Sequence, residues 1–302
     1  MYPVTERIKK DIYGSSRSFC YRLEIAMQKV VYRNEIENYI QQLEPAVVTY
    51  IEEGQIETFE GFDSFSIIAF DWYDIRDSEG DPSQMLLYID ADDLFIICEN
   101  EASYAEASKC FAGAPTNERA MYSFFKNLFR GDTRNLEDLE DRISALDDSV
   151  IHGDDDNIRE QIVDIRYEVL RLKKYYEQFE EIFDELCDND NDLISEDYLN
   201  YFDILNNRCE RLLRQVMNLR EYIVQVRESY QAQIDIEQNR LMKVFTLVTS
   251  IFLPLTLIAG WYGMNLQMPE YSWSFGYPVV ILVCVLVCVI WAVIFKKKGW
   301  FN

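Results

Sequence analysis

The sequence has little of what a catalytic or zinc-binding site needs. It contains one histidine, His152, and its seven cysteines form no CxxC pair. No phosphate-binding loop, GxSxG elbow or histidine-paired nucleophile occurs, so we expect no enzyme. Scattered cysteines in odd number are typical of reduced thiols. Cys284 and Cys288 lie four residues apart in an apolar run, but without nearby histidine we expect no soft-metal site.

Basic residues are also scarce. The chain has 29 Lys and Arg against 53 Asp and Glu, and Glu270 is the one acid after residue 240. Such an excess of negative charge repels nucleic acid, so we expect no DNA or RNA partner. Two interpretations remain open: the acids solvate long helices, or they concentrate metal ions. Residues 1–20 mix charged and polar side chains without an apolar core, so no signal peptide is predicted.

Glycine and proline are missing from the middle of the chain. No glycine lies between Gly153 and Gly260, and no proline between Pro115 and Pro254, which predicts helices. The one weak point, DNDND at residues 188–192, predicts a tight turn between a helix over about 155–187 and a helix over about 195–262. At 1.5 Å per residue the second helix is about 100 Å long. A calcium loop starting at Asp188 is excluded, because Leu193 and Leu199 occupy the positions that need glycine and glutamate.

The first 115 residues differ in composition from the middle of the chain, because they contain glycines, prolines and short runs rich in β-forming residues. Residues 64–72, 85–89 and 94–98 read as strands, the last two joined in a hairpin across residues 90–93. We therefore expect an α/β domain over residues 1–115, then a helical stalk over residues 116–240.

Two uncharged runs near the C-terminus, residues 244–261 and 277–295, are each long enough to cross a membrane. We place the first membrane helix at residues 241–262, an outer loop at 263–276, the second helix at 277–295 and a basic tail at 296–302. Lys and Arg lie outside both spans and are absent from the connecting loop, which predicts a multi-pass protein of the cell membrane with both termini in the cytosol.

The first span is more polar than the second. With 100° per residue, one stripe within about 60° of a line contains the following residues: Met242, Phe245, Thr249, Leu253, Thr256 and Gly260. The stripe either faces a shared pore axis or mediates ordinary helix packing in lipid.

The end of this span resembles a known family. Tyr262-Gly263-Met264-Asn265, followed by Met268-Pro269-Glu270, is similar to the signature of CorA-type magnesium transporters. The likeness extends upstream to Asn239-x-x-Met242-Lys243 and downstream to Gly276-Tyr277-Pro278. The resemblance implies an α+β cytosolic domain, very long helices and two C-terminal membrane helices, assembled with lipid around it as a funnel-shaped homo-oligomer of five copies.

The resemblance also implies a site. Gly263, Met264 and Asn265 form an outer selectivity filter for hydrated Mg²⁺, because amide oxygens accept hydrogen bonds from the ion's water shell without stripping it. The stripe lines the pore below, Asn239 lies at its inner mouth, and Glu270 attracts cations in the outer loop. Cytosolic Mg²⁺ is implied to hold the pore shut. Where the family's sensing aspartate aligns, this chain has Ile204, so neighbouring Asp203 is the candidate regulatory ligand.

Two alternatives remain. The same fold could move Zn²⁺, Co²⁺ or Ni²⁺, although sparse histidine and the Gly-Met-Asn motif favour Mg²⁺. A membrane-anchored coiled-coil scaffold without transport is the alternative from another class.

Overall fold

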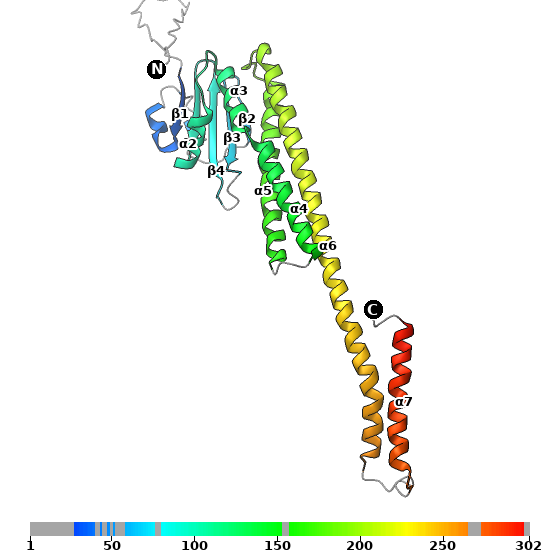
Figure 1. Ribbon diagram of the computed structural model, residues 1–302. Helices are drawn as coiled ribbons and strands as arrows, with labels where there is room; N and C mark the ends of the chain where they lie inside the picture. The colour runs from blue at the N-terminus through cyan, green and yellow to red at the C-terminus, as the bar shows by residue number, and fades with distance from the viewer. Residues whose placement is uncertain are drawn as a thin grey trace, which may run out of the picture. The chain divides into compact units, whose positions relative to one another are not determined.

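The computed structural model in Figure 1 describes residues 27–39, 43, 47–48, 51, 58–75, 80–152, 157–264 and 273–298. The chain divides into two compact units. The first comprises Met1–Ser149 with Asp154–Val226, and the second Val150–Gly153 with Arg227–Asn302.

A five-stranded sheet in the order β1-β5-β4-β3-β2 begins the first unit. The strands are β1 (Gln28–Tyr32), β2 (Phe59–Gly61), β3 (Phe65–Trp72), β4 (Ser83–Asp90) and β5 (Leu94–Cys98). The β4–β5 hairpin is confirmed, and Asp90 closes it: its carboxylate accepts from the backbone N–H groups of Asp92 and Asp93 at 2.8 and 2.6 Å. β1 pairs with β5 in parallel, whereas the other pairs are antiparallel.

Both faces of the sheet are covered. A short 3-10 helix, η1 (Arg33–Tyr39), lies over the face that includes Ile67, Tyr88 and Phe95. The helices α2 (Glu101–Cys110), α3 (Asn117–Leu128) and α5 (Ile158–Asp188) lie on the other. There the ring of Phe179 from α5 lies 4.9 Å from that of Phe70 in β3. A tilted aromatic contact of this kind adds to the stabilisation from apolar burial, so it helps to fix α5 to the sheet.

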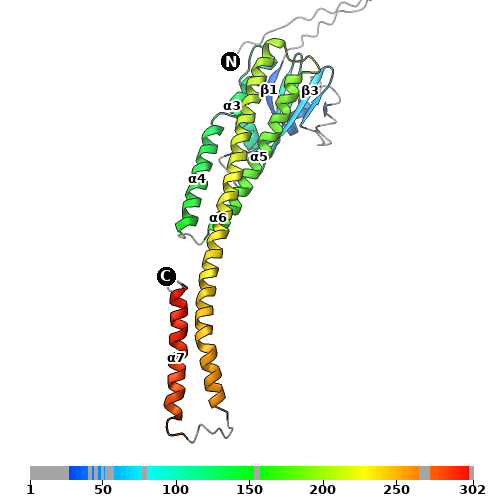
Figure 2. The ribbon, with the colours of Figure 1, turned by 90° about the vertical axis from the view of Figure 1, so that its right-hand side faces the viewer.

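Three helices form the rest of the first unit: α4 (Asp132–His152), α5 and the first part of α6 (Glu196–Tyr262). They run side by side in both views (Figures 1 and 2). Buried α6 side chains recur every three or four residues from Phe202 to Val226, so they form one apolar seam along the helix. The predicted helix boundaries at residues 155 and 195 differ only slightly from those observed.

The predicted turn at residues 188–192 is confirmed. Asn189 ends α5 with φ 50°, and its side chain bonds both the N–H and the C=O of Ile194 at 3.0 and 2.8 Å. Asn191 donates to the carbonyl of Phe62 at 3.1 Å and to the Ser66 hydroxyl at 2.7 Å. The polar run therefore closes the helix pair and attaches the turn to the sheet.

The second unit contains the remainder of α6 and α7 (Gly276–Lys297), which lie side by side (Figures 1 and 2). Both helices are long and apolar enough to cross a membrane. α6 includes Pro254, whose missing N–H leaves the carbonyl one turn earlier without its helical donor.

Candidate functional site

The outer part of α6 has two faces that differ in burial. Its half-buried positions recur every three or four residues and are these: Leu247, Ser250, Ile251, Pro254, Leu255, Ile258 and Tyr262. On a helix this spacing forms one face, and α7 is the helix beside it. One side of α6 is therefore occupied by the chain's own second span.

The predicted pore stripe lies on the opposite side of α6. Its large members are strongly exposed: Met242 by 62%, Phe245 by 65% and Leu253 by 74%. Thr249, Thr256 and Gly260 are exposed as well. In a single chain, the stripe residues predicted from their helical spacing are therefore exposed.

The hydroxyl groups near the inner end of this stripe are oriented by the helix. Thr249 Oγ1 donates to the Phe245 carbonyl at 2.8 Å, and Thr246 Oγ1 donates to the Met242 carbonyl at 2.7 Å. Because each proton is used within the helix, the oxygen lone pairs remain to accept hydrogen bonds. Such oxygens suit the water shell of a cation.

The outer end of α6 is tightly built at Gly263. Its N–H donates to the Ala259 carbonyl at 2.9 Å, and a Cβ at this position would lie 3.0 Å from that same oxygen. A Cβ on Gly260, in contrast, would meet nothing within 4 Å. A side chain at position 263 would therefore crowd the chain's own backbone, whereas one at position 260 would not.

The predicted filter is only partly described. Met264 directly follows Gly263 and is 47% exposed. Asn265 and Glu270 lie outside the described residues. Asn239 is exposed on α6, one helical turn before Lys243.

The candidate regulatory residue Asp203 is exposed on α6, beside Ile204, which is 56% exposed. Burial raises the pKa of the Cys187 thiol to about 11, and the nearby charge of Asp203 adds to the shift. Within the described part of the chain, no group of three or more His, Cys, Asp or Glu side chains is placed to hold a metal ion. One chain alone therefore builds no such site around Asp203.

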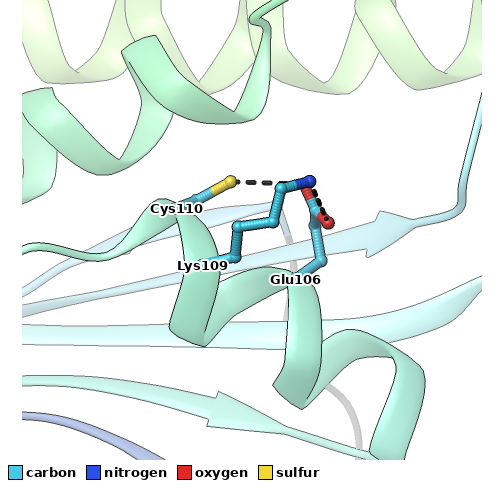
Figure 3. Close-up of polar contacts among 3 residues, drawn as sticks. All are labelled: Glu106, Lys109 and Cys110. Atoms are coloured by element: carbon cyan, nitrogen blue, oxygen red, sulfur yellow. Dashed lines mark hydrogen bonds and ion pairs between the residues drawn. The ribbon is translucent and has the colours of Figure 1, made fainter.

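A cysteine, an acid and a lysine meet on α2, as Figure 3 shows. Glu106 accepts from Lys109 Nζ at 3.0 Å and from Cys110 Sγ at 3.4 Å. Burial, then the charge of Glu106, raises the pKa of the Cys110 thiol to about 12. A thiol that stays protonated at neutral pH is a poor nucleophile, so this group stabilises the helix rather than forming a reactive site.

Comparison with known proteins identifies the family. The family model for the CorA-like Mg²⁺ transporter protein matches residues 35–297. The chain is 31% identical over 166 residues to a cobalt/magnesium transport protein CorA from Thermotoga maritima, covering 55% of this chain and 47% of the relative. It is 50% identical over 68 residues to the magnesium transport protein CorA of Escherichia coli K12, covering 22% of each.

The matched segments thus span about half or less of these relatives' length. A solved structure of the CorA magnesium transporter from Methanocaldococcus jannaschii has a TM-score of 0.74 at 20% identity, covering 95% of this chain and 94% of that one. This similarity establishes a shared fold, in which an α/β domain precedes a long helix and two apolar C-terminal helices. On the extent of the family match, the chain belongs to the CorA-like Mg²⁺ transporter family.

Proposed function

We propose that the chain forms a magnesium channel whose pore is lined by the exposed face of α6. The observation behind the proposal is the position of the stripe from Met242 to Gly260, opposite the face toward α7 and leading to Gly263-Met264. In this proposal Asn265 completes the outer filter, Asn239 lies at the inner mouth, and Glu270 attracts cations to the outer loop.

Hydrated Mg²⁺ explains the chemistry of the lining. Magnesium releases its water reluctantly, so a passive filter gains more by binding the hydrated ion than by removing its shell. Neutral oxygens on Asn265, Thr256 and Thr249 accept hydrogen bonds from that shell without the tight hold of a carboxylate. Below them, Met242 and Phe245 offer an apolar constriction that closes when water leaves it.

A single α6 cannot enclose a pore, so the proposal needs several copies. The uncovered stripe is consistent with a homo-oligomer in which the α6 helices surround one axis, and the family resemblance implies five copies. The lysines that flank the two spans favour a cytosolic position for both termini, and in this proposal the apolar outer face of α7 contacts lipid.

The ion is proposed from the relatives and the lining. The relatives' names include magnesium and cobalt, and the stripe contains neither histidine nor carboxylate. Zn²⁺ and Ni²⁺ prefer nitrogen or sulfur ligands, whereas oxygen ligands suit Mg²⁺. We therefore propose Mg²⁺ as the physiological ion.

Control by cytosolic Mg²⁺ is part of the proposal. An ion held between acidic surfaces of neighbouring copies would stabilise the closed ring, because it offsets charges that otherwise repel each other. Asp203 is exposed on the long helix and is the candidate ligand.

The test is ion uptake into vesicles that contain the purified full-length chain. Asn265→Ala is expected to abolish Mg²⁺ uptake while the oligomer stays intact by mass. Asn200→Ala, which alters an exposed asparagine near the start of α6, is the control and is expected to transport normally. Uptake unchanged by Asn265→Ala would contradict this filter, whereas no uptake by the unaltered chain would leave the scaffold alternative in place. Parallel assays with Co²⁺, Ni²⁺ and Zn²⁺ decide the ion.

A further inference from the structure

A groove of about 480 Å³ runs between α4 and α5 in the first unit. Its walls come from α5 residues 164–174 and from Arg142 of α4. The groove lies far along the sequence from the membrane helices, and the proposed pore makes no use of it.

The groove has a small excess of basic side chains in an acidic protein. Three basic residues, Arg142, Arg171 and Lys174, and two acidic residues, Asp164 and Glu168, line it, although the whole chain has a net charge of −24. Arg142 lies 3.0 Å from the carboxylate of Glu168 and neutralises it. Arg171 is held in place because its guanidinium lies 4.2 Å from the Tyr73 ring centre and donates to the Gly80 carbonyl at 2.6 Å. Lys174 is exposed at the end of the wall.

The same surface exposes apolar side chains. Val163, Tyr167 and Leu170 are 39%, 70% and 46% exposed and lie at helical spacing on one side of α5. Tyrosine and arginine are enriched at the centre of protein interfaces. A protein surface is therefore a better occupant than a free inorganic ion.

An acidic surface, opposite in charge to the basic side chains of the groove, lies on α4. Glu137, Asp138 and Asp141 are exposed on the side opposite the buried residues Leu139 and Ile143. We name these three acids the α4 ridge. It lies next to Arg142 in the sequence, so on each copy the ridge and the groove are about one helical turn apart along α4.

We propose that the groove receives the α4 ridge of a neighbouring copy of this chain. The inference rests on the proposed homo-oligomer. Around a rotation axis, equivalent residues of all copies lie at the same height along the axis. A segment that fills the groove of a neighbouring copy must therefore lie, on its own copy, at nearly the same height as the groove. The ridge meets that condition for any axis direction, and its charge is opposite to that of Arg171 and Lys174. Because groove and ridge are different patches, the contact is head-to-tail, and with the rotation of the proposed homo-oligomer it closes into a ring.

The test places a photocrosslinking amino acid, p-benzoylphenylalanine, at position 167 of the full-length chain. After illumination, mass spectrometry of mixed heavy- and light-isotope copies identifies links between copies. We expect position 167 to link to α4 residues 137–145 of a second copy. The same probe at position 201, which is also exposed, is the control and is expected to give no link to α4.

Charge reversal sharpens the test. Lys174→Glu is expected to lower the yield of the 167–α4 link about fivefold, and adding Asp141→Lys is expected to restore at least about half of it. Lys126→Glu, at an exposed position on α3, serves as the matched control without effect.

The result separates this inference from the channel proposal, because particle mass and Mg²⁺ uptake are measured on the same samples. The inference alone would be overturned if the oligomer is intact and transports Mg²⁺ but position 167 links only to a segment other than α4, to another protein or to nothing. A single-copy protein without uptake would overturn both.

Discussion

At the scale of single residues, Gly263 shows how closely the end of α6 is built. A Cβ there would lie 3.0 Å from the Ala259 carbonyl oxygen, a backbone atom that cannot move alone. Gly263→Ala is therefore expected to shift the turn into the filter and to reduce Mg²⁺ uptake about tenfold or more. Gly113→Ala, whose Cβ would meet only Gln28 Oε1 at an ordinary 3.7 Å, should leave uptake unchanged. Equal uptake by both variants would contradict a close-packed filter.

Asp132 is a buried acid at the start of α4, just after Gly131, which has φ 101°. Its carboxylate accepts from the Tyr176 hydroxyl at 3.0 Å, and Arg208 lies near enough to favour its charge. Burial still dominates and raises the pKa of Asp132 to about 6. At neutral pH the fold therefore holds a charge that its surroundings disfavour.

The pH dependence follows from this shift. Between about pH 6 and pH 4 the folded chain has bound a proton at Asp132 that the unfolded chain has not. Lowering the pH through this window therefore stabilises the folded state, by an amount on the order of 3 kcal/mol in full. Asp132→Asn should raise the melting temperature at pH 7.5, and the gain should shrink at pH 5. A gain that is constant across this range would show that Asp132 does not titrate in this way.

At the scale of elements, the aromatic contact between α5 and the sheet organises the first unit. Phe179 is fully buried, with its ring 4.9 Å from those of Phe70, Phe129 and Tyr175. Phe179→Ala is expected to destabilise this unit by about 3–5 kcal/mol, through lost burial and the cavity left behind. Ile204→Ala, at a site 56% exposed, should cost less than about 1 kcal/mol. Thermal unfolding followed by circular dichroism compares the two.

The two faces of α6 predict different effects on Mg²⁺ uptake when a hydroxyl group is removed from each. Thr256 lies on the exposed stripe, whereas Ser250 lies on the half-buried side toward α7. Thr256→Val keeps the shape and removes the hydroxyl, so it should lower Mg²⁺ uptake several-fold. Ser250→Ala removes a hydroxyl off the stripe and should transport normally. Similar losses in both variants would mean that the hydroxyls serve helix packing rather than the pore.

The sequence predicted elements best where the signal is local. The long apolar runs, the gap without glycine and the short runs of β-forming residues in β3 to β5 each indicate structure without knowledge of neighbours. β1 and β2 were not predicted, because Gln28–Tyr32 and Phe59–Gly61 are short edge strands whose pairing comes from the rest of the sheet. The stripe on α6 was found from spacing alone, but its position opposite α7 required the structure. The groove was missed because Arg142 and α5 meet only in three dimensions.

At the scale of the whole molecule, the proposed homo-oligomer has to accommodate a large acidic excess. The chain has a net charge of −24, and bringing several copies together concentrates this charge around one axis. Like charges repel even in the first unit alone: burial raises the pKa of Glu180 most, and the charges of Asp184, Glu210 and Glu177 raise it further. Divalent cations between copies would relieve such repulsion.

Removing Mg²⁺ should therefore loosen the cytosolic part of the oligomer. In the full-length protein in detergent, chelation is expected to speed cleavage by a protease at least about threefold, and added Mg²⁺ should reverse the effect, because the bound ion favours the compact state. Asp203→Asn should reduce this response if Asp203 is a ligand between copies, whereas Asn200→Ala, one helical turn earlier, should keep it. Monovalent salt at matched ionic strength separates binding from screening. Cleavage that is equally fast with and without Mg²⁺ would remove cytosolic Mg²⁺ as the signal that closes the pore, and the filter on α6 would then act without feedback.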